Sequence, residues 1–207
     1  MKRYILFFFC CITFFSYGQT IDTVFKTMPD EFLPAFSEAN KTMLLMDTSL
    51  SVIPYPLGKI ERLEYTDTFL SLKTSDVGTL QMKLLPLVNN TQIISVVKTI
   101  CSKKVCDSEI RFFSDKWEEI DKNRLMPDIQ PEIFFDASKL NTLDFKVAAS
   151  HINIYPLHFQ FNKENDDLSI KFDFTGFLSS EDLKKIEPFV EKENLILSWN
   201  KSMFVFN

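Results

Sequence analysis

The sequence predicts an α+β protein, in which helices and antiparallel strands occupy separate stretches of the chain. Apolar residues near the amino terminus repeat at helical spacing, whereas many of those between residues 59 and 114 alternate with polar residues, as strands do. Two further alternating segments, a helix and a final strand follow. Parallel α/β folds need strict alternation of strand and helix, so this order favours antiparallel sheets.

The first 18 residues read as a cleaved signal peptide. Lys2 and Arg3 precede an apolar run over residues 4–15, and small residues flank a cleavable position at Gly18. An uncleaved anchor is the alternative, but this run is shorter than the roughly 20 residues that cross a bilayer. We therefore expect a periplasmic or otherwise exported protein that begins near Gln19 and has no transmembrane segment after cleavage.

Two cysteines lie within this apolar run. Cys10 and Cys11 follow three phenylalanines, whereas a lipid-acceptor cysteine follows small residues. We expect both to leave with the signal peptide.

The mature chain, residues 19–207, is expected to form a single α+β domain, possibly built from two subunits over 19–120 and 121–207. Its formal charge is −7 once Lys2 and Arg3 are removed from a chain of net charge −5. The mature chain is acidic and has no cluster of basic residues for binding phosphates, so we expect no nucleic-acid partner.

Two helices are predicted before the strands. Ile21, Val24, Phe25 and Met28 have helical spacing. A second helix is expected to begin at Pro29-Asp30-Glu31. The expected buried face of this second helix is Phe32, Leu33, Phe36, Ala39 and Met43. Pro54 and Pro56 then indicate a connection.

Residues 59–114 are predicted to form an antiparallel meander with turns at 66–67, 75–78, 88–90 and 102–105. Leu80, Met82 and Leu84 alternate with Gln81 and Lys83, which predicts one dry and one wet face. The run 93–97 is apolar at neighbouring positions. Its strand should therefore be central, with a second layer over part of the sheet.

The remainder of the chain divides into four segments. We assign no regular secondary structure to residues 115–150. Alternation over 157–161 and 168–174 predicts a hairpin closed by residues 162–167. Ser179 can cap a helix with Asp182 three residues on, and Pro188 ends or bends that helix. Residues 195–206 form the final strand, with a turn or bulge at 200–202.

Cys101 and Cys106 end one predicted strand and begin the next. Partners across a hairpin lie about 4.5 to 5.5 Å apart between Cα atoms, within reach of a disulfide. Export exposes the pair to oxidising conditions, so we predict a structural disulfide. A redox-active or metal-binding pair is the alternative, since Lys103 and Lys104 would favour the thiolate. Four intervening residues and the lack of nearby ligands argue against it.

Several chemistries are disfavoured by composition. Gly58, Gly78 and Gly176 are the glycines after the signal peptide, so the chain has no phosphate-cradling loop, dinucleotide fingerprint or glycine-flanked nucleophile. His151 and His158 are its two histidines, at a separation that would put them on opposite faces of one strand. We therefore expect no cofactor and no metal, and read His158 as a solvated side chain.

Other candidate features have ordinary structural interpretations. The carboxylate pairs Glu118-Glu119 and Asp166-Asp167 are typical of solvated surface, and residues 165–167 lack the glycine and distal glutamate of a calcium loop. Phe69 and Phe113 fall opposite the neighbouring apolar positions. They belong either under a second layer or on a binding surface, and the core interpretation is favoured.

Several segments resemble the exported Bacteroidetes proteins grouped as domain of unknown function 3256. The residues that carry the resemblance are Thr27–Pro34, Leu80–Pro86, Val97–Cys101, Cys106–Ser108, Ile110, Phe112, Phe113 and Trp117. It is most specific around the cysteine hairpin. The resemblance implies a Gram-negative envelope location and supplies no catalytic or binding residue.

The function predicted from these features is that of a non-enzymatic module that binds an envelope protein or a small ligand. Its catalytic residues are accordingly unknown. Two alternatives stay open: a hydrolase that acts on glycans through scattered carboxylates, and a carrier of apolar ligands.

Overall fold

The computed structural model describes residues 19–46, 51–103, 105–174 and 176–207. The expectations for the signal peptide, its cleavage at Gly18, and Cys10 and Cys11 fall on residues 1–18, outside this part of the chain. Lys104, named in the redox alternative, also lies outside it.

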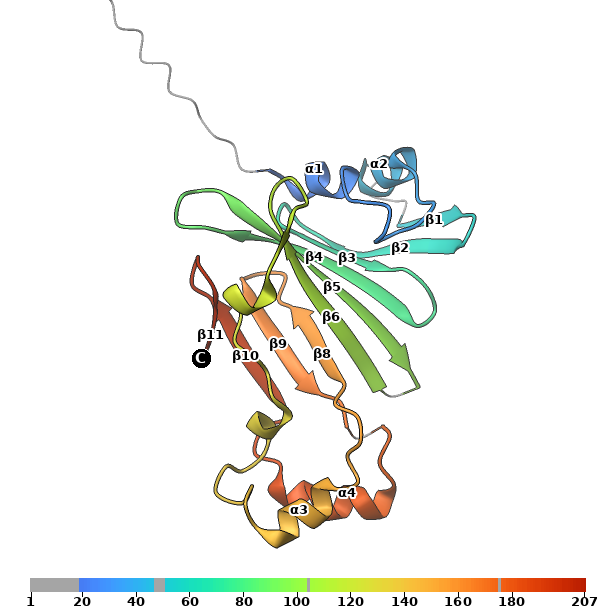
Figure 1. Ribbon diagram of the computed structural model, residues 1–207. Coiled ribbons are helices and arrows are strands. Elements are labelled where there is room, and N and C mark those ends of the chain that lie inside the picture. Colours follow the sequence, from blue (N-terminus) through green and yellow to red (C-terminus); the bar gives the residue numbers. More distant parts are fainter. Residues whose placement is uncertain (1–18, 47–50, 104, 175) are drawn as a thin grey trace, which may run out of the picture.

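The described chain is an α+β protein of two antiparallel sheets and four α-helices (Figure 1). The helices are α1 (Ile21–Lys26), α2 (Glu38–Met46), α3 (Leu143–Ala149) and α4 (Ser180–Ile186), with short 3-10 turns η1 (Lys122–Arg124), η2 (Pro131–Phe134) and η3 (Glu187–Phe189). Among the described residues, no helix is both long and apolar enough to cross a membrane.

The larger sheet is the predicted meander, with its strands side by side in chain order. They are β1 (Val52–Tyr55), β2 (Gly58–Tyr65), β3 (Phe69–Lys73), β4 (Gly78–Pro86), β5 (Gln92–Ser102), β6 (Val105–Phe113) and β7 (Glu119–Ile120). The predicted turns separate these strands. Each neighbouring pair is antiparallel, so local hairpins build the whole sheet.

The smaller sheet has the order β11-β10-β9-β8. Its strands are β8 (Leu157–Phe161), β9 (Asp167–Phe172), β10 (Asn194–Trp199) and β11 (Phe204–Phe206). The predicted hairpin is β8–β9. The predicted final segment is a second hairpin, β10–β11, with the predicted turn at 200–202, where Asn200 Oδ1 accepts from the backbone N–H groups of Ser202 and Met203.

Two hydrophobic clusters cover opposite faces of the larger sheet. One joins α1 and α2 to one face, and it contains Leu80, Met82 and Leu84. The other joins the opposite face to the smaller sheet. The run Ile93–Val97 of β5 is buried throughout, which confirms the prediction of a central strand covered on both faces. Phe69 and Phe113 are buried in opposite clusters, so both are core residues.

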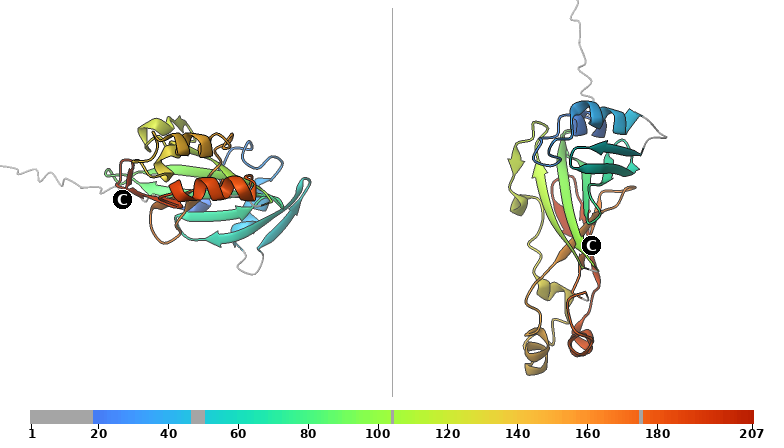
Figure 2. Two further views of the ribbon diagram at one scale, coloured as in Figure 1. Left: turned by 90° about the horizontal axis from the view of Figure 1, so that it is seen from below. Right: turned by 90° about the vertical axis from the view of Figure 1, so that its right-hand side faces the viewer.

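The helices lie at the two ends of an elongated molecule. Figure 2 shows α1 and α2 at one end, with α3 and α4 side by side at the other. Helix α4 begins as predicted, because Ser179 Oγ accepts a hydrogen bond of 3.1 Å from the backbone N–H of Asp182. Pro188 lies in η3, where it ends the α-helical path.

The second N-terminal helix begins later than the sequence predicts. Ala35 has a φ of 61°, a left-handed conformation that interrupts a helix, so α2 starts at Glu38. This shift rotates the helix relative to the expected face: Leu44 and Leu45 are buried, whereas Ala39 and Met43 are exposed. Phe32, Leu33 and Phe36 are buried as predicted, but from the turns before the helix.

Two further segments differ from the sequence prediction. Pro54 lies inside a strand rather than in a connection, because β1 is at the edge of the sheet, where a missing N–H is tolerated. The stretch 115–150 contains β7, two 3-10 turns and α3. Helix α3 is capped by Thr142, whose hydroxyl accepts from Phe145 N at 3.2 Å.

The face of β4 that was predicted to be wet is an interface between the sheets. Lys83 is only 1% exposed. Its ammonium donates to the Asn162 carbonyl at 3.3 Å and lies 3.5 Å from an Asp166 carboxylate oxygen. It also lies 5.9 Å from the ring centre of Phe69. Burial is the main influence on this amine and lowers the pKa of Lys83, while Asp166 opposes the shift.

Replacing Lys83 separates the contributions of its stem and its charge. We expect Lys83→Ala to lower the free energy of unfolding by about 2 kcal/mol, because it leaves a cavity between the sheets. Lys83→Met keeps most of the apolar stem, so its loss should be less than half as large. Urea unfolding monitored by tryptophan fluorescence measures both. If Lys83→Ala and Lys83→Met lost the same free energy of unfolding, the result would contradict a stabilising role for the methylene stem.

Candidate functional site

The disulfide hairpin is the site that the sequence singled out. Cys101 on β5 lies directly opposite Cys106 on β6, with a Cα–Cα distance of 4.0 Å and an S–S bond. Lys103 has a φ of 57° in the turn between them. The bond therefore closes the tip of the β5–β6 hairpin of the larger sheet.

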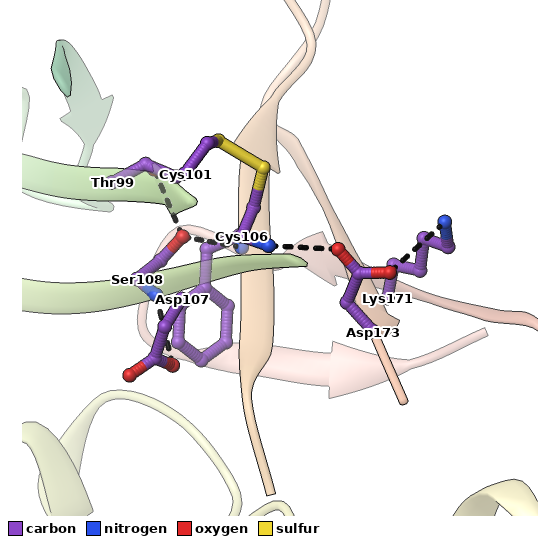
Figure 3. The surroundings of a disulfide bond; sticks show 8 residues. Thr99, Cys101, Cys106, Asp107, Ser108, Lys171 and Asp173 are labelled. Atoms are coloured by element: carbon purple, nitrogen blue, oxygen red, sulfur yellow. Dashed lines mark hydrogen bonds and ion pairs between the residues drawn. A yellow bond between two sulfur atoms is a disulfide. The ribbon is translucent and has the colours of Figure 1, made fainter. Parts of the chain in front are cut away.

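The hairpin tip is held against the smaller sheet by a buried carboxylate. The backbone N–H of Cys106 donates to Asp173 Oδ2 at 2.8 Å, and Lys171 Nζ lies 3.5 Å from the other oxygen of that carboxylate (Figure 3). Asp173 follows β9 and is only 4% exposed. The disulfide thus restrains a backbone segment that is hydrogen-bonded to Asp173, next to β9 of the smaller sheet.

Side chains of the larger sheet also hold the edge of β8. The N–H groups of Leu157, Phe159 and Phe161 point away from β9, the only neighbour of β8 in its sheet. Each instead donates to a side-chain oxygen of the larger sheet. The acceptors are Asp107 Oδ1 at 3.2 Å, Ser108 Oγ at 3.1 Å and Gln81 Oε1 at 3.0 Å, in that order along the strand.

These contacts give the cysteine hairpin a structural interpretation. Asp107 and Ser108 immediately follow Cys106, so the disulfide restrains two of the three side chains that satisfy the β8 edge. Within the described residues, no group of three histidine, cysteine or acidic side chains is placed to hold a metal.

The two histidines lie in separate environments. His158 is half-buried on β8, which differs from the solvated position that we expected. Burial lowers the pKa of His158, Asp173 opposes that shift and Lys171 reinforces it. His151 is exposed after α3, with its Nδ1 3.6 Å from Asp182.

Three of the four carboxylates in the predicted pairs have structural partners, and Glu118 is exposed. Both oxygens of Glu119 accept from Arg111, at 3.0 and 2.9 Å. Asp166 pairs with Lys83, and Asp167 accepts from Ser198 Oγ at 2.6 Å. Hydrogen bonding to Arg111 lowers the pKa of Glu119, whereas a glycosidase general acid needs a raised one.

Two surface hollows flank α4, and sequence reasoning missed both. One, of about 440 Å³, is lined by Lys171, Phe172, Phe174, Leu183, Glu187, Val190, Glu191 and Glu193. The other, of about 430 Å³, is lined by Leu143, Asp144, Val147, Ala148, Lys184, Lys185, Pro188 and Phe189. The available signal was the dense charge along residues 184–193, which contain three lysines and three glutamates.

Comparisons with known proteins agree with the fold. Residues 13–204 match the family described as protein of unknown function (DUF3256). The chain is similar to the solved structure of a domain of an uncharacterized protein from Porphyromonas gingivalis W83, with a TM-score of 0.81 and 23% identity over 92% of this chain and 100% of that one. The sequence matches no curated protein.

Removing the disulfide tests its structural role. We expect Cys101→Ala/Cys106→Ala to lower the free energy of unfolding by about 2 kcal/mol, as the closure of a short loop implies, with an unchanged circular dichroism spectrum. Urea unfolding measures the loss. Catalysis of insulin reduction by the wild-type protein, absent in this variant, would instead support the redox alternative.

Removing one acceptor tests the closure of the β8 edge. Ser108→Ala leaves the Phe159 N–H without its partner, and we expect a loss of about 1 to 2 kcal/mol with faster amide exchange at Phe159. Ser108→Thr keeps a hydroxyl and serves as the control. Unchanged exchange in Ser108→Ala would show that water replaces the side chain.

The lowered pKa of His158 predicts a pH dependence. In the unfolded chain this histidine takes up a proton near its ordinary pKa of 6.5, whereas in the folded protein it does so only at lower pH. The unfolded state therefore binds more protons as pH falls, and stability decreases from about pH 7.5 to 5. We expect His158→Gln to flatten this decrease in chemical unfolding measured across that range. An identical slope in the variant would contradict the assignment.

Proposed function

We propose that this chain, which belongs to the DUF3256 family of proteins of unknown function, is an exported envelope protein. Its mature part, residues 19–207, acts as one non-enzymatic module that binds another protein. The amino-terminal sequence and the oxidised cysteine pair support export, because disulfides persist in oxidising compartments. One hydrophobic cluster contains residues from Phe69 to Phe204, which supports a single domain.

The observation that carries the binding proposal is a group of exposed apolar side chains on α3 and the segment after it. Leu143 is 75% exposed and Val147 is 55% exposed, one helical turn further on. Ile154 and Tyr155 are each 53% exposed. We name Leu143, Val147, Ile154 and Tyr155 the α3 surface. Exposed apolar side chains one turn apart on a helix, such as Leu143 and Val147, are typical of a protein contact.

The other two functions receive less support. Glu119, Asp166 and Asp167 are held by Arg111, Lys83 and Ser198, so they are poorly suited to opposed acid and base roles. Both faces of the larger sheet are filled by packed side chains. This packing favours binding at the surface over an internal apolar cavity.

A comparative cross-linking experiment tests the binding proposal. A tagged wild-type chain, cross-linked in the envelope, should capture a defined partner, and Leu143→Ser/Val147→Ser should capture at least about fivefold less, because truncation removes apolar contact area. Val77→Ser/Val88→Ser, at exposed turns of the larger sheet, is the matched control. Equal recovery by both variants, or no partner in repeated trials, would count against the α3 surface.

Fractionation tests the proposed location. Osmotic shock should release the protein with periplasmic markers, and mass spectrometry should give an amino terminus at Gln19. Retention in the cytoplasm with residues 1–18 intact would overturn the export proposal.

A further inference from the structure

The hollow between α3 and α4, which we name the α3–α4 hollow, has an apolar lining and walls of opposite charge. Its volume is about 430 Å³. Both helical segments contribute the apolar lining, which consists of Leu143, Val147, Ala148, Pro188 and Phe189. Asp144 lines the α3 wall, whereas Lys184 and Lys185 line the α4 wall. Most of these side chains are exposed, so the hollow is open to the surface of a partner.

Two contacts show that α3 and α4 are antiparallel neighbours. The ring centres of Phe145, near the start of α3, and Phe189, after α4, lie 5.5 Å apart. At the opposite end, Nδ1 of His151, just after α3, lies 3.6 Å from Asp182, near the start of α4. Figure 2 shows the two helices side by side. The start of α3 therefore lies beside the end of α4.

Each wall of the α3–α4 hollow carries an unpaired charge. Asp144 and Lys184 are exposed, and neither has an ion-pair partner among the described residues. Lys185 differs, because its ammonium lies 3.0 Å from the Asp182 carboxylate. The hollow thus presents a free carboxylate on the α3 wall and a free ammonium on the α4 wall. A surface with both signs is complementary to a copy of itself whose two walls are exchanged.

We propose that the α3–α4 hollow is the interface of a homodimer, in which it is occupied by the same surface of a second copy of the chain. The inference rests on the proposed function, since it names the partner that the α3 surface binds. A two-fold axis that runs along the hollow exchanges its walls and places α3 of each copy over α4 of the other. Every favourable contact in such an isologous interface forms twice.

This arrangement matches both the apolar and the charged parts of the surface. Leu143, at the start of α3, contacts Pro188 and Phe189 of the other copy, because these residues lie at the same level along the hollow. Asp144 approaches Lys184 of the other copy, whose flexible stem spans the remaining offset. A partner with only acidic or only basic residues would leave one wall unpaired, whereas a second copy supplies both charges.

Sedimentation equilibrium of purified residues 19–207 with charge reversals tests the pairing. The wild type should dimerise. Asp144→Lys and Lys184→Glu should each weaken the dimer about tenfold, because each creates two like-charge contacts across the axis. An equimolar mixture of the two variants should recover the wild-type affinity, because each variant supplies the charge that the other lacks. That recovery also shows that both variants fold.

Asp115→Lys and Lys116→Glu, at exposed positions in the turn before β7, are the matched controls and should dimerise as the wild type does. A monomeric wild type, no recovery in the mixture, or equal weakening by the site and control variants would overturn the proposal. The cross-linking test changes Leu143 and Val147 instead. Capture of a different protein through these residues, by a chain that sediments as a monomer, would overturn the homodimer and leave the proposed function standing.

Discussion

The free edge of β8 is the constraint on which the arrangement of the two sheets depends. An edge strand carries unpaired N–H groups that must bind water or another acceptor. Here Asp107, Ser108 and Gln81 accept from alternate residues of β8, so a row of side chains replaces the missing neighbouring strand. The two sheets are therefore joined by directional bonds as well as by apolar packing, and this fixes where the smaller sheet sits.

The disulfide and Lys83 act at the two ends of that row of contacts. Cys101–Cys106 restrains the hairpin tip beside Asp107, while Lys83 reaches Asn162 at the other end of β8. Burying an ammonium is costly unless it is paired, which Asp166 achieves at 3.5 Å. The polar groups between the sheets thus favour one position of the smaller sheet relative to the larger one. A shift of β8 by one residue would separate all these donors from their acceptors.

Both helical ends of the molecule carry exposed apolar side chains. At one end, α1 and α2 pack most of their apolar residues against the larger sheet but leave Met43 and Met46 exposed. At the other, α3 keeps Leu143 and Val147 exposed, and α4 divides a lysine-lined hollow from a glutamate-lined one. The end that we propose for binding is therefore distinguished by the exposed Leu143 and Val147 of α3.

The sequence by itself determined the local hairpins, the capped helix at Ser179, the cysteine pair and the central strand at 93–97, because each depends on residues close together in the chain. It assigned Gln81 and Lys83 to a solvated face, since alternation marks polarity but not what covers a face. Only the tertiary structure decided that this face meets β8 and that His158 is half-buried. Such placements depend on contacts between residues tens of positions apart, which no local pattern records.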